Sequence, residues 1–362
     1  MKQLPCRRGF EVVKTIAFYL PQYYPIPEND RWWGPGFTDW VNVKKAVPQF
    51  SGHYQPHVPS DLGYYDLRFA DIREQQADLA REHGVSGFCY YYYWFSGTKL
   101  LHQPVESMLN SRKPDFPFCL SWANENWTRR WDGRDEEILI EQHHHPEDDE
   151  RLAEDLMPFF QDPRYIKIDG KPLLLIYRTD LLPDARKTVE TLRSAGRLHG
   201  FRDLCLARVE SFGCSEENPE DSGFDLAVEF HPHFRYEGVP YRMLYGNRVY
   251  SYADLVAHVN RSRSPRYLRL PAVLVGWDNT ARRNSGGVIF DGSSPGLYGE
   301  WLAKAVRQAE RFSPEHQIVF INAWNEWAEG CHLEPDQKFG CDYLKKTAEI
   351  VQERGAACRI LR

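Results

Sequence analysis

The chain has 362 residues and a formal net charge of -6, and 14% of its residues are Phe, Trp or Tyr. The negative balance disfavours a nucleic-acid partner, because affinity for nucleic acid rests largely on neutralising phosphates. No apolar stretch is long enough to span a bilayer, and the one that follows the basic N-terminal residues is too short for a signal peptide. The eight Cys are scattered without a CxxC pair, which is typical of a reducing compartment. We therefore expect a cytoplasmic protein, unless a longer precursor is exported.

Eight apolar runs of strand length recur along the chain, and most are followed by a helix-like segment. The predicted strands are Val12–Leu20, Val85–Tyr92, Phe116–Trp122, Pro172–Tyr177, Leu204–Val209, Phe224–Phe230, Leu270–Gly276 and Gln317–Ala323. The predicted helices are Arg68–His83, Val105–Asn110, Pro146–Phe160, Pro183–His199, Tyr252–Asn260, Gly296–Phe312 and Tyr343–Arg354. A long insertion rich in Pro, Gly and Trp separates the first strand from the first helix.

This alternation of strands and helices indicates an α/β fold. Buried parallel strands read as unbroken apolar runs, and eight such units are what a (β/α)8 TIM barrel requires. A doubly wound sheet usually carries a Gly-rich nucleotide turn after its first strand, where this chain has Pro21-Gln22-Tyr23-Tyr24-Pro25. No low-complexity linker interrupts the pattern. We predict a single-domain barrel over residues 1–362, with elaborated loops at its C-terminal face.

Polar and aromatic side chains gather where the predicted strands end, which is where TIM barrels place their active sites. Aromatic rings suit the C–H faces of sugars, although core filling is the alternative for many of them. We predict that these strand ends bind an oligosaccharide or polysaccharide. The predicted substrate-binding residues are Tyr19, Gln22, Trp40, Tyr92, Trp94, Trp122, Asn124, Glu125, Trp127, Tyr177, Glu229, His231, Trp277, Asp278, Asn325 and Trp327.

Two acids, Glu326 and Glu329, directly follow the eighth predicted strand and are framed by Trp324 and Trp327. Glycoside cleavage needs such a pair, with one acid to protonate the leaving oxygen and one carboxylate to act on the other partner. Two close carboxylates in an aromatic pocket also push their pKa values apart. Alternatively, one acid caps the following turn or pairs with an arginine. The candidate arginines are Arg129, Arg130 and Arg282. We predict that the pair is catalytic.

Glu125 is the strongest third acid, held among indoles and amides in Trp122–Trp127. It binds substrate hydroxyls, replaces one member of the pair, or forms an ion pair with a nearby arginine; these alternatives stay open. His53 and His57 either line the pocket or order the first long loop. The adjacent Arg282 and Arg283 either bind an anionic sugar or form an ordinary surface pair.

Motifs for metal or cofactor chemistry are weak. The side chains of His143, His144 and His145 project in different directions and lack a second ligand pair at a zinc spacing, so we predict no metal. GxxxxGK[ST] and HExxH are absent, which disfavours phosphotransfer and zinc proteolysis. We predict no cofactor.

Several long motifs, in order, resemble the WbsX-like proteins, also called the glycoside hydrolase family 99-like domain. The motifs are Phe18-Tyr19-Leu20-Pro21-Gln22-Tyr23, Trp32-Trp33-Gly34, Gly36-Phe37-Thr38-Asp39-Trp40, His53-Tyr54-Gln55-Pro56, Asp61-Leu62-Gly63-Tyr64-Tyr65, Trp122-Ala123-Asn124-Glu125-Asn126-Trp127-Thr128 and Trp324-Asn325-Glu326-Trp327-Ala328-Glu329-Gly330. The resemblance runs from the first predicted strand to the last helix and links the chain to the endo-α-mannosidases and endo-α-mannanases.

The resemblance implies a (β/α)8 barrel and a retaining endo-acting hydrolase of an α-linked, mannose- or rhamnose-like polysaccharide. It implies that Glu326 deprotonates the sugar's own 2-hydroxyl, which attacks the anomeric carbon, while Glu329 protonates the leaving oxygen. Ala328 departs from the larger polar residue that the mannosidases tend to carry. WbsX-like proteins have also been labelled glycosyltransferases, so the alternative is a glycosyltransferase or transglycosylase in bacterial surface-polysaccharide (O-antigen) biosynthesis.

Overall fold

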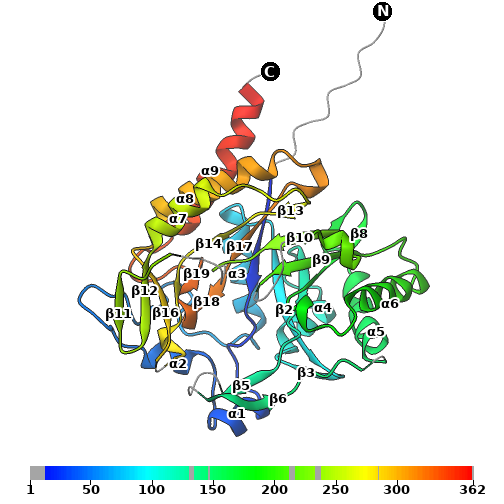
Figure 1. Cartoon of the computed structure of the whole chain (residues 1–362), viewed down its shortest axis with the longest axis horizontal. Coiled ribbons are helices and arrows are strands. Elements are labelled where there is room, and N and C mark those ends of the chain that lie inside the picture. The colour runs from blue at the N-terminus through cyan, green and yellow to red at the C-terminus, as the bar shows by residue number, and fades with distance from the viewer. Residues whose placement is uncertain are drawn as a thin grey trace, which may run out of the picture.

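A ring of parallel strands forms the centre of the molecule (Figure 1). The computed structural model describes residues 13–129, 134–145, 147–211, 217–232, 238–283 and 285–360, with the main chain alone at 135 and 353–360. The strands pair in the order β13–β10–β9–β8–β4–β2–β1–β17–β14. Their bounds are β1 (Lys14–Tyr19), β2 (Gly87–Phe95), β4 (Phe118–Trp122), β8 (Lys171–Ile176), β9 (Cys205–Glu210), β10 (Leu226–Glu229), β13 (Arg269–Leu270), β14 (Ala272–Leu274) and β17 (Ile318–Asn322).

Pro271 divides the seventh predicted strand into two short pieces. The piece before it, β13, pairs with β10, and the piece after it, β14, pairs with β17. Proline lacks the N–H that would continue a ladder, so a break at this residue is expected. The ring therefore closes through Pro271, and the predicted (β/α)8 barrel is confirmed.

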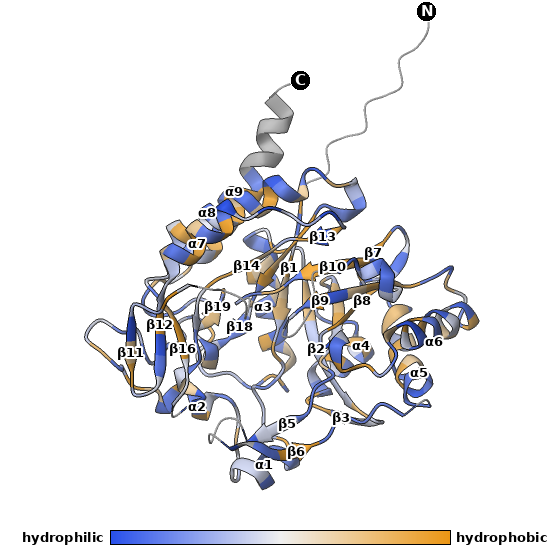
Figure 2. Cartoon of the chain, viewed as in Figure 1, coloured by the Kyte–Doolittle hydropathy of each residue, from blue (hydrophilic) through white to orange (hydrophobic). Residues whose placement is uncertain are grey.

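Seven helices surround the barrel at the predicted places. They are α3 (Ala70–Glu82), α4 (Gln103–Ser111), α5 (Asp148–Phe160), α6 (Ala185–Leu198), α7 (Tyr252–Arg261), α8 (Pro295–Ala309) and α9 (Asp342–Ile360). Two predicted ends, Val12 and Pro146, lie outside the described residues. Figure 2 shows hydrophobic residues concentrated on the central strands, whereas the helices around them mix hydrophobic and hydrophilic residues. No helix in the described ranges is both long and apolar enough to cross a lipid bilayer.

Every residue of β2 is buried, because one face of the strand fills the barrel and the other faces the helices. Inside the barrel, the ring of Phe18 lies 5.7 Å from Tyr91, 5.4 Å from Phe230 and 5.4 Å from Phe320, measured between ring centroids. Outside it, the ring of Tyr19 packs on Phe88 and Tyr90 of β2. Successive residues of one strand therefore belong to two different cores.

Short elements that the sequence did not predict lie at the carboxyl ends of the strands, except β7, which pairs with the amino end of β8. A small sheet pairs its strands in the order β11–β12–β16–β15 and lies beside the barrel in Figure 1. Its strands are β11 (Arg242–Leu244), β12 (Asn247–Ser251), β15 (Trp277–Asp278) and β16 (Val288–Asp291). The other short elements are α1 (Pro27–Trp33), α2 (Trp40–Lys45), β3 (Thr98–Leu100), β5 (Trp127–Arg129), β6 (Arg134–Ile140), β7 (Lys167–Ile168), β18 (Asn325–Glu326) and β19 (Cys331–His332).

Gly87 on β2 tests how tightly the barrel is packed. A Cβ at this position would lie 2.8 Å from the carbonyl oxygen of Pro117, which is main chain and cannot easily move away. We expect Gly87→Ala to lower the free energy of unfolding by about 1–3 kcal/mol in urea titrations. Gly296→Ala is the control, because its Cβ would meet nothing closer than 4.0 Å. Equal destabilisation by the two substitutions would contradict the packing argument.

Candidate active site

A cleft of about 460 Å³ lies between the carboxyl ends of the barrel strands and the small sheet. Of the predicted site residues, it brings together Gln22, Glu125, Trp127, Tyr177, Trp277, Glu326 and Glu329. Arg282 and Arg283, for which the sequence left a sugar-binding role open, also line it, together with Trp33, Tyr91, Tyr93, Phe230, Arg248 and Asn279. Rings, carboxylates and guanidinium groups therefore share one concave surface, which is the composition expected of a site for a polar ligand with apolar faces.

Glu326 and Glu329 project toward the same arginine because of the turn between them. The segment Trp327–Glu329 forms a 3₁₀ turn, η6, and Glu326 directly precedes it. Side chains three residues apart eclipse one another in a 3₁₀ helix. Nη2 of Arg282 lies 3.1 Å from Oε2 of Glu326, and its Nη1 lies 2.8 Å from Oε1 of Glu329. The pairing with Arg282 is thus one of the predicted alternatives, and it involves both acids.

A third carboxylate completes this cluster. Asp39, immediately before α2, is fully buried and lies 2.5 Å from Nη2 of Arg282. One guanidinium therefore faces three acids. Burial raises the pKa of Glu326 to about 8, opposed by Arg282 and reinforced by the charge of Glu329. Burial likewise raises the pKa of Glu329. The pair therefore holds a proton near neutral pH, as a general acid requires.

Asn325 fixes the position of this turn from the barrel side. Its Oδ1 accepts the main-chain N–H of Leu20 at 2.7 Å, and its Nδ2 donates to the carbonyl of Leu20 at 3.0 Å. The hydroxyl of Tyr23 donates to the carbonyl of Asn325 at 2.7 Å and accepts the N–H of Trp327 at 3.1 Å. Asn325 is buried, so its amide joins the ends of β1 and β17 and does not line the cleft.

Glu334 holds the indoles of Trp324 and Trp327, which frame Glu326. It accepts the indole N–H groups of Trp324 at 2.9 Å and Trp327 at 2.7 Å. It also accepts the hydroxyl of Tyr65 at 2.7 Å and the amide of Gln76 at 2.6 Å. Burial raises the pKa of Glu334 to about 7, although these hydrogen bonds lower it. Trp327, predicted to contact sugar, is therefore an internal support for η6.

Glu125 lies in the cleft and pairs with Arg178 on the next strand end. Its Oε2 is 3.1 Å from Nη1 of Arg178. Asn124 accepts the N–H of Arg178 and donates to its carbonyl, both at 2.8 Å, which joins the ends of β4 and β8. Arg129 pairs instead with Glu137, and the other arginine considered from the sequence, residue 130, lies outside the described residues. Glu125 thus combines an ion pair with access to the cleft.

The prediction for β2 selected the wrong face of the strand. Tyr91 and Tyr93 line the cleft, whereas the predicted Tyr92 and Trp94 face the helices. The indole N–H of Trp94 donates to Asp155 on α5 at 2.7 Å. Alternation along a strand requires this result, since residues two apart share a face. The alternation was not visible in the sequence, because every residue of this stretch is aromatic.

Three more predicted residues are anchored away from the cleft. Tyr19 donates its hydroxyl to a side chain on α3 at 2.6 Å. Trp40 and Trp122 donate their indole N–H groups to main-chain carbonyls at 2.8 and 3.2 Å. All three are buried and do not line the cleft, so they serve the core and not a sugar surface.

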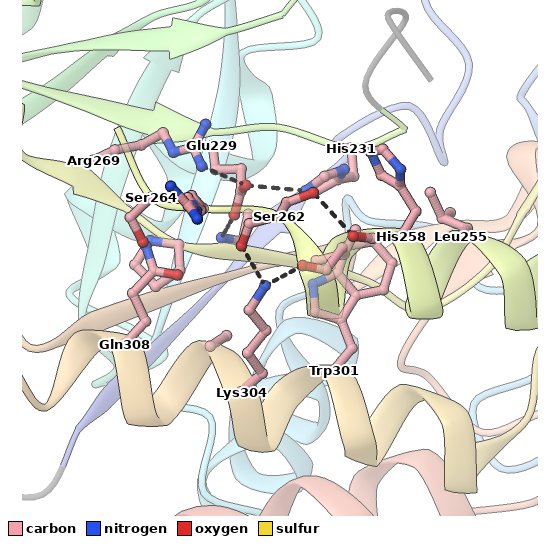
Figure 3. Close-up of a pocket in the computed structure, with 15 residues that line it drawn as sticks. Glu229, His231, Leu255, His258, Ser262, Ser264, Arg269, Trp301, Lys304 and Gln308 are labelled. Carbon is pink, nitrogen blue, oxygen red and sulfur yellow. Dashed lines mark hydrogen bonds and ion pairs between the residues drawn. The ribbon is translucent and has the colours of Figure 1, made fainter. Parts of the chain in front are cut away.

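Glu229 and His231 face a different pocket, of about 210 Å³, between the helices α7 and α8 and the strands β10 and β13 (Figure 3). Glu229 lies 3.1 Å from Nη2 of Arg269 and 3.6 Å from Nε2 of His231. Although burial raises the pKa of Glu229, Arg269 and His231 lower it to about 2. The ring of His231 meets that of Trp301 at right angles, 4.7 Å away. These predicted residues therefore belong to a charged network that joins strand to helix.

Asp278 orders the first long loop. It accepts Nε2 of His53 and the amide of Gln55, both at 2.7 Å, and caps the turn at Thr280. Burial acts to raise the pKa of Asp278, but these hydrogen bonds hold it below its usual value. Asp278 and His53 do not line the cleft, which resolves the question of His53 in favour of loop ordering.

Among the described residues, His57, His332 and Asp336 offer ligand atoms within 4.8 Å of one another and form a group that could hold a metal ion. The Nδ1 of His332 faces the carbonyl of Glu334 at 2.9 Å and must donate to it. The Nε2 of His332 then accepts from Nδ1 of His57 at 2.8 Å. A cation would have to displace this shared proton.

A family model described as Glycosyltransferase WbsX matches residues 15–347. The chain belongs to this WbsX family. Two curated relatives, each called "Uncharacterized protein WxcX", come from two strains of Xanthomonas campestris pv. campestris. Each is 43% identical over 343 residues, which is 93% of this chain and 49% of the relative. The chain therefore spans about half the length of the curated relatives it matches.

Solved structures share the barrel fold of this WbsX-family chain. The GH99 endo-alpha-mannosidase of Bacteroides thetaiotaomicron aligns with a TM-score of 0.59 at 19% identity, covering 96% of this chain and 98% of that chain. A protein described as "Glycoside hydrolase-like protein" aligns with a TM-score of 0.61 at 14% identity, covering 97% of each. At these identities the likeness establishes the fold alone.

The raised pKa of Glu326 makes folding of this WbsX-family chain depend on pH. In the unfolded chain the pKa of a Glu is about 4.3, so the folded protein binds this proton more tightly. The stabilisation is complete below about pH 4.3 and is lost as pH rises toward about 8. We expect Glu326→Gln to gain stability over wild type across that window, on the order of a few kcal/mol. Glu190→Gln, at an exposed position of α6, is the control in urea titrations. A difference in unfolding free energy between Glu326→Gln and wild type that does not change with pH would contradict the argument.

Proposed function

We propose that the protein is a retaining, endo-acting glycoside hydrolase of an α-linked, mannose- or rhamnose-like polysaccharide. The observation that carries this proposal is the pairing of Glu326 and Glu329 on one guanidinium in an aromatic cleft. The endo-alpha-mannosidase with the same fold supports this choice of reaction. The rings of Tyr91, Tyr93 and Trp127 offer faces for sugar C–H groups, while Gln22 and Glu125 offer partners for hydroxyls.

In the first step, the carboxylate of Glu326 takes the proton of the sugar 2-hydroxyl, and O2 attacks the anomeric carbon. The bond from that carbon to the leaving oxygen breaks, and Glu329 gives its proton to the leaving oxygen. In the second step, Glu329 takes a proton from water, whose oxygen opens the 1,2-anhydro ring at the anomeric carbon. Glu326 then returns its proton to O2. Two inversions at the anomeric carbon give net retention.

The proton must begin this sequence on Glu329, whereas burial favours it on Glu326, raising the pKa of that carboxyl to about 8. Glu326 is also the less exposed of the two acids, at 9% against 21% for the side chain of Glu329. A 2-hydroxyl donating to Glu326 would stabilise its ionised form, because a hydrogen bond to a carboxylate lowers its pKa. Bound substrate therefore sets the charge distribution that the reaction requires.

Substitution of each acid tests both the function and the division of roles. With a panel of α-linked oligosaccharides followed by mass spectrometry, we expect wild type to cleave at least one. Glu326→Gln and Glu329→Gln are each expected to lose about 10²-fold or more of the rate, because each removes a proton-transfer group. Undiminished cleavage in both variants would exclude the proposed roles.

A glycosyl fluoride of the cleaved sugar separates the acid from the base. Fluoride leaves without protonation, and added azide opens the 1,2-anhydro ring without a base. With both, Glu329→Gln should recover most of its rate while Glu326→Gln stays slow. The reverse pattern would assign the acid role to Glu326. Glu190→Gln is the control, since that exposed carboxylate on α6 lies outside the cleft.

Glycosyl transfer is the second candidate, and the description of the family as a glycosyltransferase favours it. The same two acids could pass the sugar to a hydroxyl of another glycan in place of water. A transferase that uses an activated donor would bind a nucleotide sugar. We expect calorimetric titration of the protein with UDP- and GDP-sugars to show no binding. Binding at micromolar concentration, followed by release of the nucleotide, would favour the transferase.

A further inference from the structure

The small sheet presents one face to the cleft, and its register shows which side chains share that face. Arg248 on β12 is opposite Val288 on β16, and both line the cleft. Met243 on the edge strand β11 is opposite Arg248. Side chains at directly opposed positions of paired strands point to the same side. The row Met243–Arg248–Val288 therefore runs from the sheet edge into the cleft on one surface.

The outer end of this surface is apolar and exposed. Met243 is 58% exposed, and Tyr245, at the tip of the β11–β12 hairpin, is 78% exposed. The tip lies against the cleft wall, since a Cβ on Gly246 would be only 3.5 Å from the nitrogen of Gly286, which lines the cleft. The exposed side chains thus adjoin the cleft.

Tyr245 occupies a backbone conformation that tyrosine rarely adopts. Its φ is 50° and that of Gly246 is 81°, so the two-residue turn needs a left-handed conformation at both positions. Asn or Gly would fill the first position at lower conformational cost. An exposed tyrosine in this costly left-handed conformation does not serve the stability of the hairpin, which points to a contact with another molecule.

The two sides of the cleft differ in how their charges are matched. On the barrel side, Glu326 and Glu329 meet Arg282, and Glu125 meets Arg178. On the small-sheet side, the guanidinium of Arg248 makes no side-chain hydrogen bond or ion pair with any described residue. A ligand that complements this side therefore brings negative charge to it.

We propose that the glycan bound in the cleft continues over the β11–β12 hairpin, with an acidic sugar at Arg248 and further sugar faces on Met243 and Tyr245. The inference rests on the proposed function and specifies its substrate class as an acidic polymer. A guanidinium binds a carboxylate or phosphate substituent through paired N–H groups, and exposed rings stack on sugar C–H faces. Continuity with the cleft favours a glycan over a protein partner at this surface.

The test uses an array of acidic and neutral microbial polysaccharides, with all proteins carrying Glu329→Gln to prevent cleavage. We expect binding to acidic glycans, reduced about ten-fold or more by Arg248→Gln and weakened by added salt. Arg242→Gln is the matched control on the same hairpin, because Arg242 lies on the opposite face, over the ring of Phe50. Equal binding by the two arginine variants, or binding to neutral glycans alone, would overturn the inference and leave the hydrolase proposal standing.

Tyr245→Asn tests the hairpin without endangering the fold, since Asn suits the turn. We expect unchanged or higher thermal stability, and a several-fold loss of affinity for long chains but not for short oligosaccharides that fill only the cleft. Leu198→Ser, at an 88% exposed position at the end of α6, is the control. Unchanged affinity for long chains would exclude the hairpin as a glycan surface. A change in sedimentation of the variant would then indicate that the hairpin contacts a second copy of the protein. Failure of every protein to bind any glycan would overturn the hydrolase proposal as well.

Discussion

The arrangement of the cleft depends on one buried cation shared by three acids. Arg282 meets Glu326, Glu329 and Asp39, and Arg282 and Asp39 are almost completely enclosed by protein. If all three acids were ionised, the cluster would carry a net negative charge in a poorly solvated place, which is costly. Retention of a proton on the glutamate pair relieves this cost. The charge balance that stabilises the cluster therefore leaves a proton on the glutamate pair, as general acid catalysis requires.

This cation also connects loops that are far apart in the chain. Asp39 comes from the loop after β1, Arg282 from the segment after β15, and the glutamates from the end of β17. Around them, the polar groups of Asn325 and Glu334 bond to other parts of the protein. Asn325 bonds to the main chain at the end of β1, and Glu334 accepts the indole N–H groups of Trp324, before the turn, and Trp327, within it. Rigid support of this kind lets two flexible carboxylate side chains keep a fixed relation to substrate.

The sequence allowed prediction of the barrel and of the place of Glu326 and Glu329 in one cleft, but not of the face that each aromatic residue takes. Strands buried on both sides read as apolar runs, so their existence was clear and their alternation was hidden. Tyr91 and Tyr92 are chemically identical, and only the pleat of β2 sends one to the cleft and the other to a helix. Asp39 and the small sheet were missed for a different reason. Asp39 pairs with Arg282, 243 residues further along the chain, and β12 of the small sheet pairs in parallel with β16, which follows it only after a long connection. No local signal in the sequence specifies such pairings.

The two sides of the cleft thus have different physical origins. The barrel side carries matched charges on strand ends whose positions the barrel itself determines, which suits chemistry that tolerates little displacement. The other side is built from an inserted sheet, whose cleft-facing row runs from the exposed Met243 through Arg248 to Val288. Among the described residues no hydrogen bond joins this row to Glu326 or Glu329, so substitutions in the row can change what binds while both acids keep Arg282. The proposed hydrolysis and the alternative transfer both assign the chemistry to Glu326 and Glu329, so they differ in whether water or a glycan hydroxyl attacks the anomeric carbon.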